Sequence, residues 1–175
     1  MWGRSLNGVL RGNMPRVYVS FGSNIDPERN IRSGVRALKE AYPKLTVSPV
    51  YKNKAVGFAG DDFYNLVIGF ESDRSVYSIV EQLKHIEDIY NRTRNRRRFS
   101  SRTLDIDLLL YDDLVISGRG LNLPRDEITQ YAFVLYPLSE IAGHEKHPVS
   151  GKQYRVLWEE FDKTTQHLQR VDFQW

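Results

Sequence analysis

The fold of this chain is constrained most by the order in which strand-like and helix-like hydrophobic patterns follow one another. Hydrophobic residues recur at every second position in some segments, as in strands, and at every third or fourth position in others, as in helices. The segments follow one another as strand, helix, strand, strand, helix and strand over residues 16–24, 26–42, 45–51, 63–72, 79–90 and 103–113. This order predicts an α+β fold with the βαββαβ core of ferredoxin-like domains.

Further elements are predicted after this core, and they would complete an α-β-α sandwich. They are a hairpin, two helices and a final strand, at residues 112–123, 132–142, 154–161 and 167–175.

Three local features refine the predicted core. Asp26 stands where a helix cap is expected, directly before Pro27. Pro49 cannot donate a ladder hydrogen bond, so we expect its strand at a sheet edge. Residues 108–110 are leucines that make the last core strand apolar on both faces, which favours a central position in the sheet.

Length and composition fit a single domain. The chain has 175 residues, of which 41% are hydrophobic and 27% charged, the balance of a globular protein. We expect residues 1–14 to form a flexible N-terminal arm and residues 15–175 to form the domain. No cysteine is present, so disulfides are excluded and a cytoplasmic location is expected. We also expect the protein to be a monomer. The apolar runs are too short to cross a membrane.

Two aspartates in the last core strand are candidate metal ligands. Asp105 and Asp107 are two positions apart, so their side chains share one face of the strand, whereas Ile106 and Leu108 take the other. Mg²⁺ is commonly held by one or two carboxylates together with phosphate oxygens. The alternative is that both carboxylates form ion pairs with nearby arginines at the surface.

The arginines before this strand indicate an anionic partner. Six of them fall within eleven residues, at Arg92, Arg94, Arg96, Arg97, Arg98 and Arg102. Cations for phosphate oxygens beside carboxylates for metal ions suit phosphoryl transfer, which depends on positioning and charge. The chain has no Walker loop, so arginines and metal ions would hold any nucleotide. Since like charges repel until a polyphosphate neutralises them, we expect this loop to close over bound nucleotide.

Four blocks together resemble the 6-hydroxymethyl-7,8-dihydropterin pyrophosphokinase (HPPK) family of folate biosynthesis. The blocks, in the order of that family, are YVSFGSNIDPERNI, FYNLVIGFES, RTLDIDLLLY and AFVLYPLSEIA. The resemblance extends from Val17 to the C-terminus. It implies a transferase that moves the terminal pyrophosphate of ATP to the hydroxymethyl group of a dihydropterin and releases AMP.

The resemblance also implies roles for individual residues. It implies that two Mg²⁺ ions bind Asp105 and Asp107, and that Arg92, Arg102 and Asp107 are catalytic. It places at the ATP site Glu87, Arg92, Arg94, Arg98, Arg102 and Arg125. It places at the pterin site Asn53, Val56, Gly57, Phe63, Asn65, Phe99 and Phe133. Phe63 and Phe133 could each belong to the hydrophobic core instead. The polar Asn65 within an apolar strand is harder to explain by a role in the core.

Some positions depart from the family pattern. Arg125 and Tyr131 stand where the family usually has histidine and arginine, and the loop before Gly57 lacks the usual threonine and prolines. Three interpretations of the function therefore stay open. The chain is a working pyrophosphokinase, or a variant that is weak or acts on a related pterin, or a nucleic-acid-binding module of ferredoxin-like topology. We do not expect this chain to bind nucleic acid, because RNA-binding sheets of this topology display aromatic residues where this strand has Asp105 and Asp107.

Overall fold

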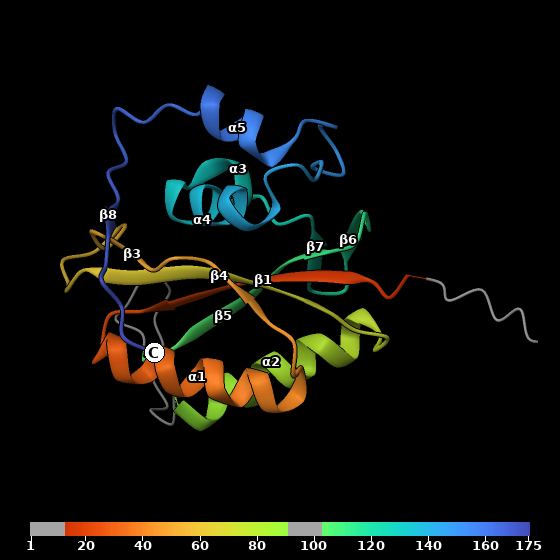
Figure 1. The fold of residues 1–175 in the computed structure, drawn as a ribbon, viewed down its shortest axis with the longest axis horizontal. Helices are drawn as coiled ribbons and strands as arrows, with labels where there is room; N and C mark the ends of the chain where they lie inside the picture. Colours follow the sequence, from red (N-terminus) through yellow and green to blue (C-terminus); the bar gives the residue numbers. More distant parts are fainter. Residues whose placement is uncertain (1–12, 91–102) are drawn as a thin grey trace, which may run out of the picture.

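An antiparallel sheet separates two layers of helices (Figure 1). The computed structural model describes residues 13–90 and 103–175. The core elements are β1 (Arg16–Ser23), α1 (Pro27–Ala41), β2 (Thr46–Val47), β3 (Tyr51–Asn53), β4 (Phe63–Glu71), α2 (Val76–Tyr90) and β5 (Asp105–Tyr111). The later elements are β6 (Ile116–Gly118), β7 (Leu121–Leu123), α3 (Glu127–Gln130), α4 (Ala132–Ala142), α5 (Tyr154–Glu160) and β8 (Gln169–Arg170).

The sheet has the strand order β5-β1-β4-β3-β8, and β2 also pairs with β4. Helices α1 and α2 cover one face, and α3, α4 and α5 lie on the other (Figure 1). The predicted α+β sandwich with a ferredoxin-like βαββαβ core is therefore confirmed, with its second strand divided into β2 and β3. The predicted hairpin is also present, as β6 paired with β7.

Two apolar clusters explain why the strands carry hydrophobic residues on both faces. Val19 and Phe21 point to the cluster shared with α1 and α2, whereas Tyr18 belongs to the cluster shared with α4. The same division holds in β4, where Leu66 contributes to the first cluster and Val67 to the second. Burial of both faces is the usual reason for a nearly continuous apolar strand.

The structure corrects the expectation for residues 45–51. The chain pairs with β4 at Thr46–Val47 and again at Tyr51–Asn53, and Pro49 lies in the break between these strands. β2 pairs within the described residues with β4 alone and so lies at the sheet edge, as expected, whereas β3 has β8 on its other side.

Three further expectations also need correction. β5 is the outermost strand at one end of the sheet and not a central strand. Its leucines are nevertheless buried, because helices cover both of its faces. Asp26 occupies the N-cap position of α1 with a positive φ of 41° and makes no side-chain capping hydrogen bond. In the final segment, the two residues of β8 form the strand, which is much shorter than predicted.

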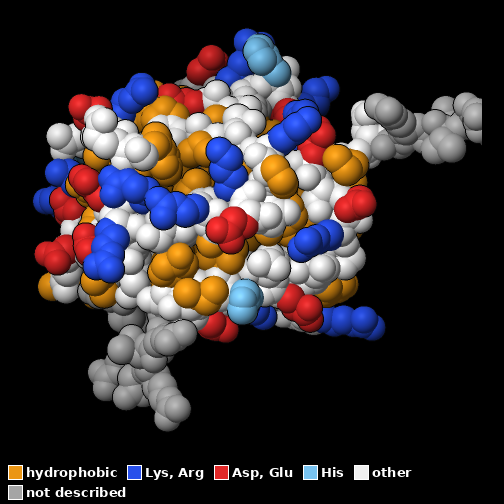
Figure 2. Space-filling model, turned by 60° about the horizontal axis from the view of Figure 1, so that its bottom comes forward, with side chains coloured by type: hydrophobic (Ala, Val, Ile, Leu, Met, Phe, Trp, Pro, Cys, Tyr) orange, Lys and Arg blue, Asp and Glu red, His pale blue; other side chains and the backbone are white. Residues whose placement is uncertain are grey.

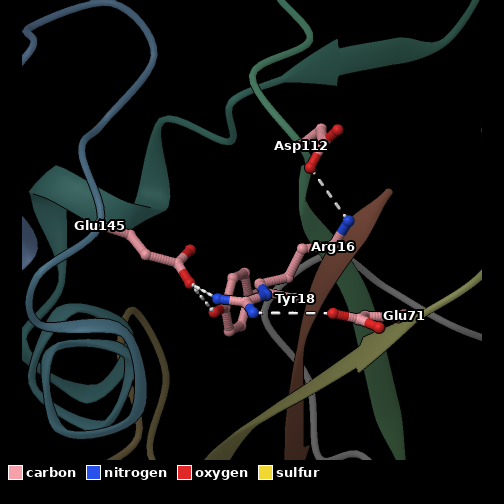
Figure 3. Close-up of polar contacts among 5 residues, drawn as sticks. All are labelled: Arg16, Tyr18, Glu71, Asp112 and Glu145. Carbon is pink, nitrogen blue, oxygen red and sulfur yellow. Dashed lines mark hydrogen bonds and ion pairs between the residues drawn. The ribbon is translucent and has the colours of Figure 1, made fainter. Parts of the chain in front are cut away.

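A polar cluster holds the beginning of β1 (Figure 3). The Arg16 guanidinium forms an ion pair with Glu145 and lies 3.6 Å from a carboxylate oxygen of Glu71. The Tyr18 hydroxyl donates to the same Glu145 carboxylate at 2.7 Å, and the Arg16 amide donates to Asp112 at 3.0 Å. The hydrogen bond and charge of Glu145 raise the pKa of Arg16. These contacts join β1 to β4, to the end of β5 and to the loop after α4.

The described parts of the chain contain no helix that is both long and apolar enough to cross a bilayer. The expected N-terminal arm lies almost entirely outside the described residues, which begin at Asn13.

Candidate active site

A cavity of about 370 Å³ opens at the end of the sheet where β1 finishes and β5 begins. Its walls come from β1, β4, β5, the loop after β3 and the segment that leads into α4. The lining residues are Ser20, Phe21, Gly22, Asn53, Val56, Phe58, Phe63, Asn65, Asp105, Asp107, Leu109, Arg125, Glu127, Tyr131, Phe133 and Val134. Carboxylates, an amide and aromatic rings therefore share one cavity.

The two aspartates stand together on the cavity side of β5. Asp105 is opposite Gly22 and Asp107 is opposite Ser20 in the pairing with β1. Ile106 and Leu108, between and beyond them, are buried in the core below. This arrangement confirms the predicted alternation of the strand and directs both carboxylates toward the cavity.

A third carboxyl group lies behind this pair. The Ile106 amide donates to Oε1 of Glu87 at 2.7 Å, which fixes the end of α2 against β5. Burial raises the pKa of Glu87, the Ile106 amide lowers it, and the charge and hydrogen bond of Asp105 with the charge of Asp107 raise it again. Together these effects bring the pKa of Glu87 to about 8. The site thus holds more carboxyl groups than it can ionise together at neutral pH.

Among the described residues, Arg125 is the positively charged side chain that lines the cavity. Its Nη2 atom lies 2.9 Å from Oε1 of Glu127 and 3.7 Å from Oδ1 of Asp107. Its buried Nε atom has no hydrogen-bond partner within the described ranges. The guanidinium therefore lies beside Asp107 in the cavity wall, where its positive charge suits an anionic ligand.

An amide pair forms the floor between β1 and β3. Asn65 Nδ2 donates to Oδ1 of Asn53, and Asn65 is opposite Gly22 in the pairing of β4 with β1. A Cβ atom at Gly22 would lie 3.0 Å from Oδ1 of Asn65. The missing side chain at Gly22 thus leaves room for the amide between the two strands.

Aromatic rings form two walls of the cavity. Tyr131 and Phe133 stack with their ring centroids 5.0 Å apart and their planes 15° apart. Phe58 and Phe63 meet edge to face, with centroids 6.2 Å apart. Phe63 and Phe133 are only partly buried, so both rings offer surface to a flat ligand, although Phe133 also packs against the upper core.

The cavity brings together most of the described residues that the sequence suggested. Asn53, Val56, Phe63, Asn65, Asp105, Asp107, Arg125 and Phe133 line it. Gly57 lies in the adjoining loop with a φ of 80°, and Glu87 supports β5 from behind. The remaining predicted residues, and the expected closure of the arginine loop, lie outside the described residues: Arg92, Arg94, Arg98, Phe99 and Arg102.

Sequence reasoning missed other wall residues. The sequence marks Tyr131 only as a departure from a family pattern, and it does not indicate that Phe58 or Glu127 lines a site. The sequence signal that could have indicated Phe58 as a wall residue is its place as an aromatic residue in a glycine-containing loop. The role of Gly22 depends on its register against Asn65, which the sequence does not reveal.

Comparison with known proteins finds relatives over most of the chain. A profile of the family described as 7,8-dihydro-6-hydroxymethylpterin-pyrophosphokinase (HPPK) matches residues 18–143. The 2-amino-4-hydroxy-6-hydroxymethyldihydropteridine pyrophosphokinase of Haemophilus influenzae is 32% identical over 134 residues, which cover 74% of this chain and 83% of that protein. The protein of the same name from Aquifex aeolicus is 32% identical over 141 residues, covering 79% of this chain and 88% of that protein.

A solved structure shares the fold. The wild-type HPPK-DHPS protein of Plasmodium falciparum aligns with a TM-score of 0.63 and 14% identity, over 85% of this chain and 45% of that chain. This chain therefore spans less than half of that longer protein.

Proposed function

Because the chain belongs to the 7,8-dihydro-6-hydroxymethylpterin-pyrophosphokinase family, we propose that it transfers pyrophosphate from ATP to 6-hydroxymethyl-7,8-dihydropterin, a step of folate biosynthesis. The hydroxymethyl oxygen bonds to the β-phosphorus of ATP, and AMP leaves with the oxygen that bridged the α- and β-phosphates. The observation that carries this proposal is the single cavity in which the carboxylates of β5 face an amide and stacked rings.

The carboxylates suit magnesium. Asp105 and Asp107 present hard oxygen ligands on one strand face. The pKa of Glu87 behind them is raised by burial first and then by the negative charge of both aspartates, a charge that a cation would relieve. The described residues hold no group of three or more His, Cys, Asp or Glu side chains placed to bind a metal ion. Waters and phosphate oxygens would therefore have to complete the coordination of an ion at Asp105 and Asp107. We propose two Mg²⁺ ions held by this pair; when bound, they would neutralise developing charge on the triphosphate.

The amide and the rings suit the pterin. Asn65 and Asn53 offer both donor and acceptor groups, which the edge of a pterin requires. Phe63 and Phe133 would lie on the faces of the heterocycle, with Val56 and Gly57 at its rim and Phe99 contributing from the arginine loop. Tight packing of a flat ring between aromatic walls would exclude water from the reacting hydroxymethyl group.

The arginines suit ATP. Arg125 lines the cavity 3.7 Å from Asp107, and guanidinium groups bind phosphate oxygens through paired hydrogen bonds. By similarity to the family, Arg92, Arg94, Arg98 and Arg102 would bind the same triphosphate. Arg92 and Arg102 would act with Asp107 at the reacting phosphate.

We also propose that the enzyme acts as a monomer in the cytoplasm and does not bind nucleic acid. The face in Figure 2 supports the last point, because acidic and basic side chains are interspersed on it. A nucleic-acid-binding face would gather positive charge.

The test is AMP formation from ATP, Mg²⁺ and 6-hydroxymethyl-7,8-dihydropterin. We expect AMP from the parent protein, loss of at least about 100-fold in kcat for Asp107→Asn, and parental activity for Asp113→Asn. Asp113 is an exposed aspartate just beyond the same strand and is a matched control. Polyphosphate binding that needs neither Mg²⁺ nor pterin but competes with RNA would refute the proposal.

A further inference from the structure

The segment after α5 crosses the molecule from one helical layer to the other. In Figure 1 it descends from α5, passes the sheet edge as β8 and ends beside α1. The family profile matches residues 18–143, so this segment lies beyond the matched region. Within it, Gln166 is the side chain that contacts the backbone beside the candidate active site.

Gln166 bridges the junction between α3 and α4. Its Oε1 atom accepts a hydrogen bond of 2.9 Å from the Ala132 amide, and its Nε2 atom donates one of 2.9 Å to the Gln130 carbonyl. Both partners are backbone groups, and they flank Tyr131 on either side. One side-chain amide therefore pairs with this turn as a neighbouring peptide group would.

The junction needs such a partner. The first amides of a helix have no acceptor within the helix, and Tyr131, at the N-cap position of α4, supplies no side-chain capping bond among the described residues. Gln166 satisfies the first of these amides from outside the helix. Losing a capping contact typically destabilises a helix end, so the start of α4 depends on Gln166.

The start of α4 carries the aromatic wall of the cavity. Tyr131 precedes Ala132, Phe133 follows it, and the two rings stack against each other and line the cavity. A second cavity of about 600 Å³ lies behind this wall; it is lined by Gln166 and shares Asn53, Val56 and Phe133 with the first. Phe133 thus has open space on one side, while Tyr131 and Phe133 also pack against the upper core. The junction is the polar contact that fixes the backbone between these two rings.

We propose that Gln166 is a positioning residue for the pterin site: it fixes the start of α4 and so holds the Tyr131 and Phe133 rings at the distance that a flat heterocycle requires. This inference rests on the proposed function. It predicts that loss of the Gln166 bridge weakens use of the pterin and leaves use of ATP nearly unchanged, because a wall displaced by about 1 Å disturbs the ligand that it contacts.

The experiment compares three variants for kinetics and amide exchange. Gln166→Leu removes both hydrogen bonds, Gln166→Glu keeps an acceptor for the Ala132 amide, and Gln174→Leu is the control. Gln174 lies in the same segment, and its side chain bonds only to Asp172 among the described residues. We expect Gln166→Leu to raise the KM for the pterin about tenfold with the KM for ATP within about twofold, and to speed exchange of the Ala132 amide. Gln166→Glu should recover part of both effects.

Two results would overturn the inference. One is parental exchange at Ala132 in Gln166→Leu; the other is faster exchange with an unchanged KM for the pterin, or with both KM values and kcat altered alike. A folded parent protein that forms no AMP would refute the proposed function instead. In that case the rate of exchange at Ala132 would still decide whether Gln166 fixes the start of α4.

Discussion

Replacing Glu87 with glutamine should make folding stability less dependent on pH. Glu87 lies behind the aspartate pair, where burial and the neighbouring carboxylates raise its pKa from 4.5 to about 8. Glutamine has nearly the shape of the protonated acid, so it can accept from the Ile106 amide and donate toward Asp105. The variant therefore reproduces the neutral form of Glu87 at every pH.

The direction of the effect follows from proton linkage. In the unfolded chain Glu87 ionises near pH 4.5, whereas in the folded protein it keeps its proton until about pH 8. Between these values the folded state binds more protons, so the free energy of unfolding falls as pH rises and reaches its lower level above pH 8. The full shift is worth about 5 kcal/mol at 1.36 kcal/mol per unit. Because Asp105 shares this charge, we expect about half of that, ~2 kcal/mol, from Glu87 alone.

Urea unfolding of the metal-free protein at a series of pH values measures this difference. Near pH 5 the parent and Glu87→Gln should be similar, and near pH 8.5 the variant should be more stable by ~2 kcal/mol, or about 4 to 8 °C in Tm for a chain of this size. Asp88→Asn, an exposed neighbour on α2, is the matched control and should follow the parent. A stability difference between Glu87→Gln and the parent that is the same at pH 5 and pH 8.5 would refute the reasoning.

Two further predictions concern the cavity. Gly22→Ala should press a methyl group against Oδ1 of Asn65, which would be 3.0 Å away; we expect the KM for the pterin to rise about tenfold and stability to fall by ~1 kcal/mol, and an unchanged KM would contradict the assigned contact. Arg125→Met should raise the KM for ATP about tenfold through loss of charge-assisted hydrogen bonds, with the KM for the pterin nearly constant. Equal effects on both substrates would show that Arg125 has a general structural role.

The features that the sequence predicted well are those set by local periodicity. Alternation along β5 places Asp105 and Asp107 opposite Ile106 and Leu108 whatever the rest of the fold does, and the structure agrees. Asn65 was informative for the same reason, since a polar group in an apolar strand needs a partner. The structure supplies one in Asn53.

Features that depend on distant pairing could not be predicted from periodicity. The leucines of β5 are buried at the end of the sheet order because helices cover both of its faces, a tertiary effect that resembles a central strand in sequence. Gln166 lies 34 residues from the amide that it caps, and no local pattern links the two. Proline, by contrast, acted locally, and Pro49 divided a predicted strand as its missing amide requires.

The segment after α5 also bears on the order in which this protein reaches its native state. Its contacts join residues far apart in sequence: the Arg32 guanidinium donates to the Gln174 carbonyl, 142 residues away, and stacks over Phe173. Contacts of such separation close large loops and form after nearby ones. The Gln166 bridge spans 34 residues, fewer than the pairing of Val17 with Tyr111 within the sheet. The start of α4 can therefore be fixed early, whereas the contact of the last residues with α1 closes the larger loop and forms late. Formation of the aromatic wall and docking of the final residues on α1 are then separable events in the folding of one domain.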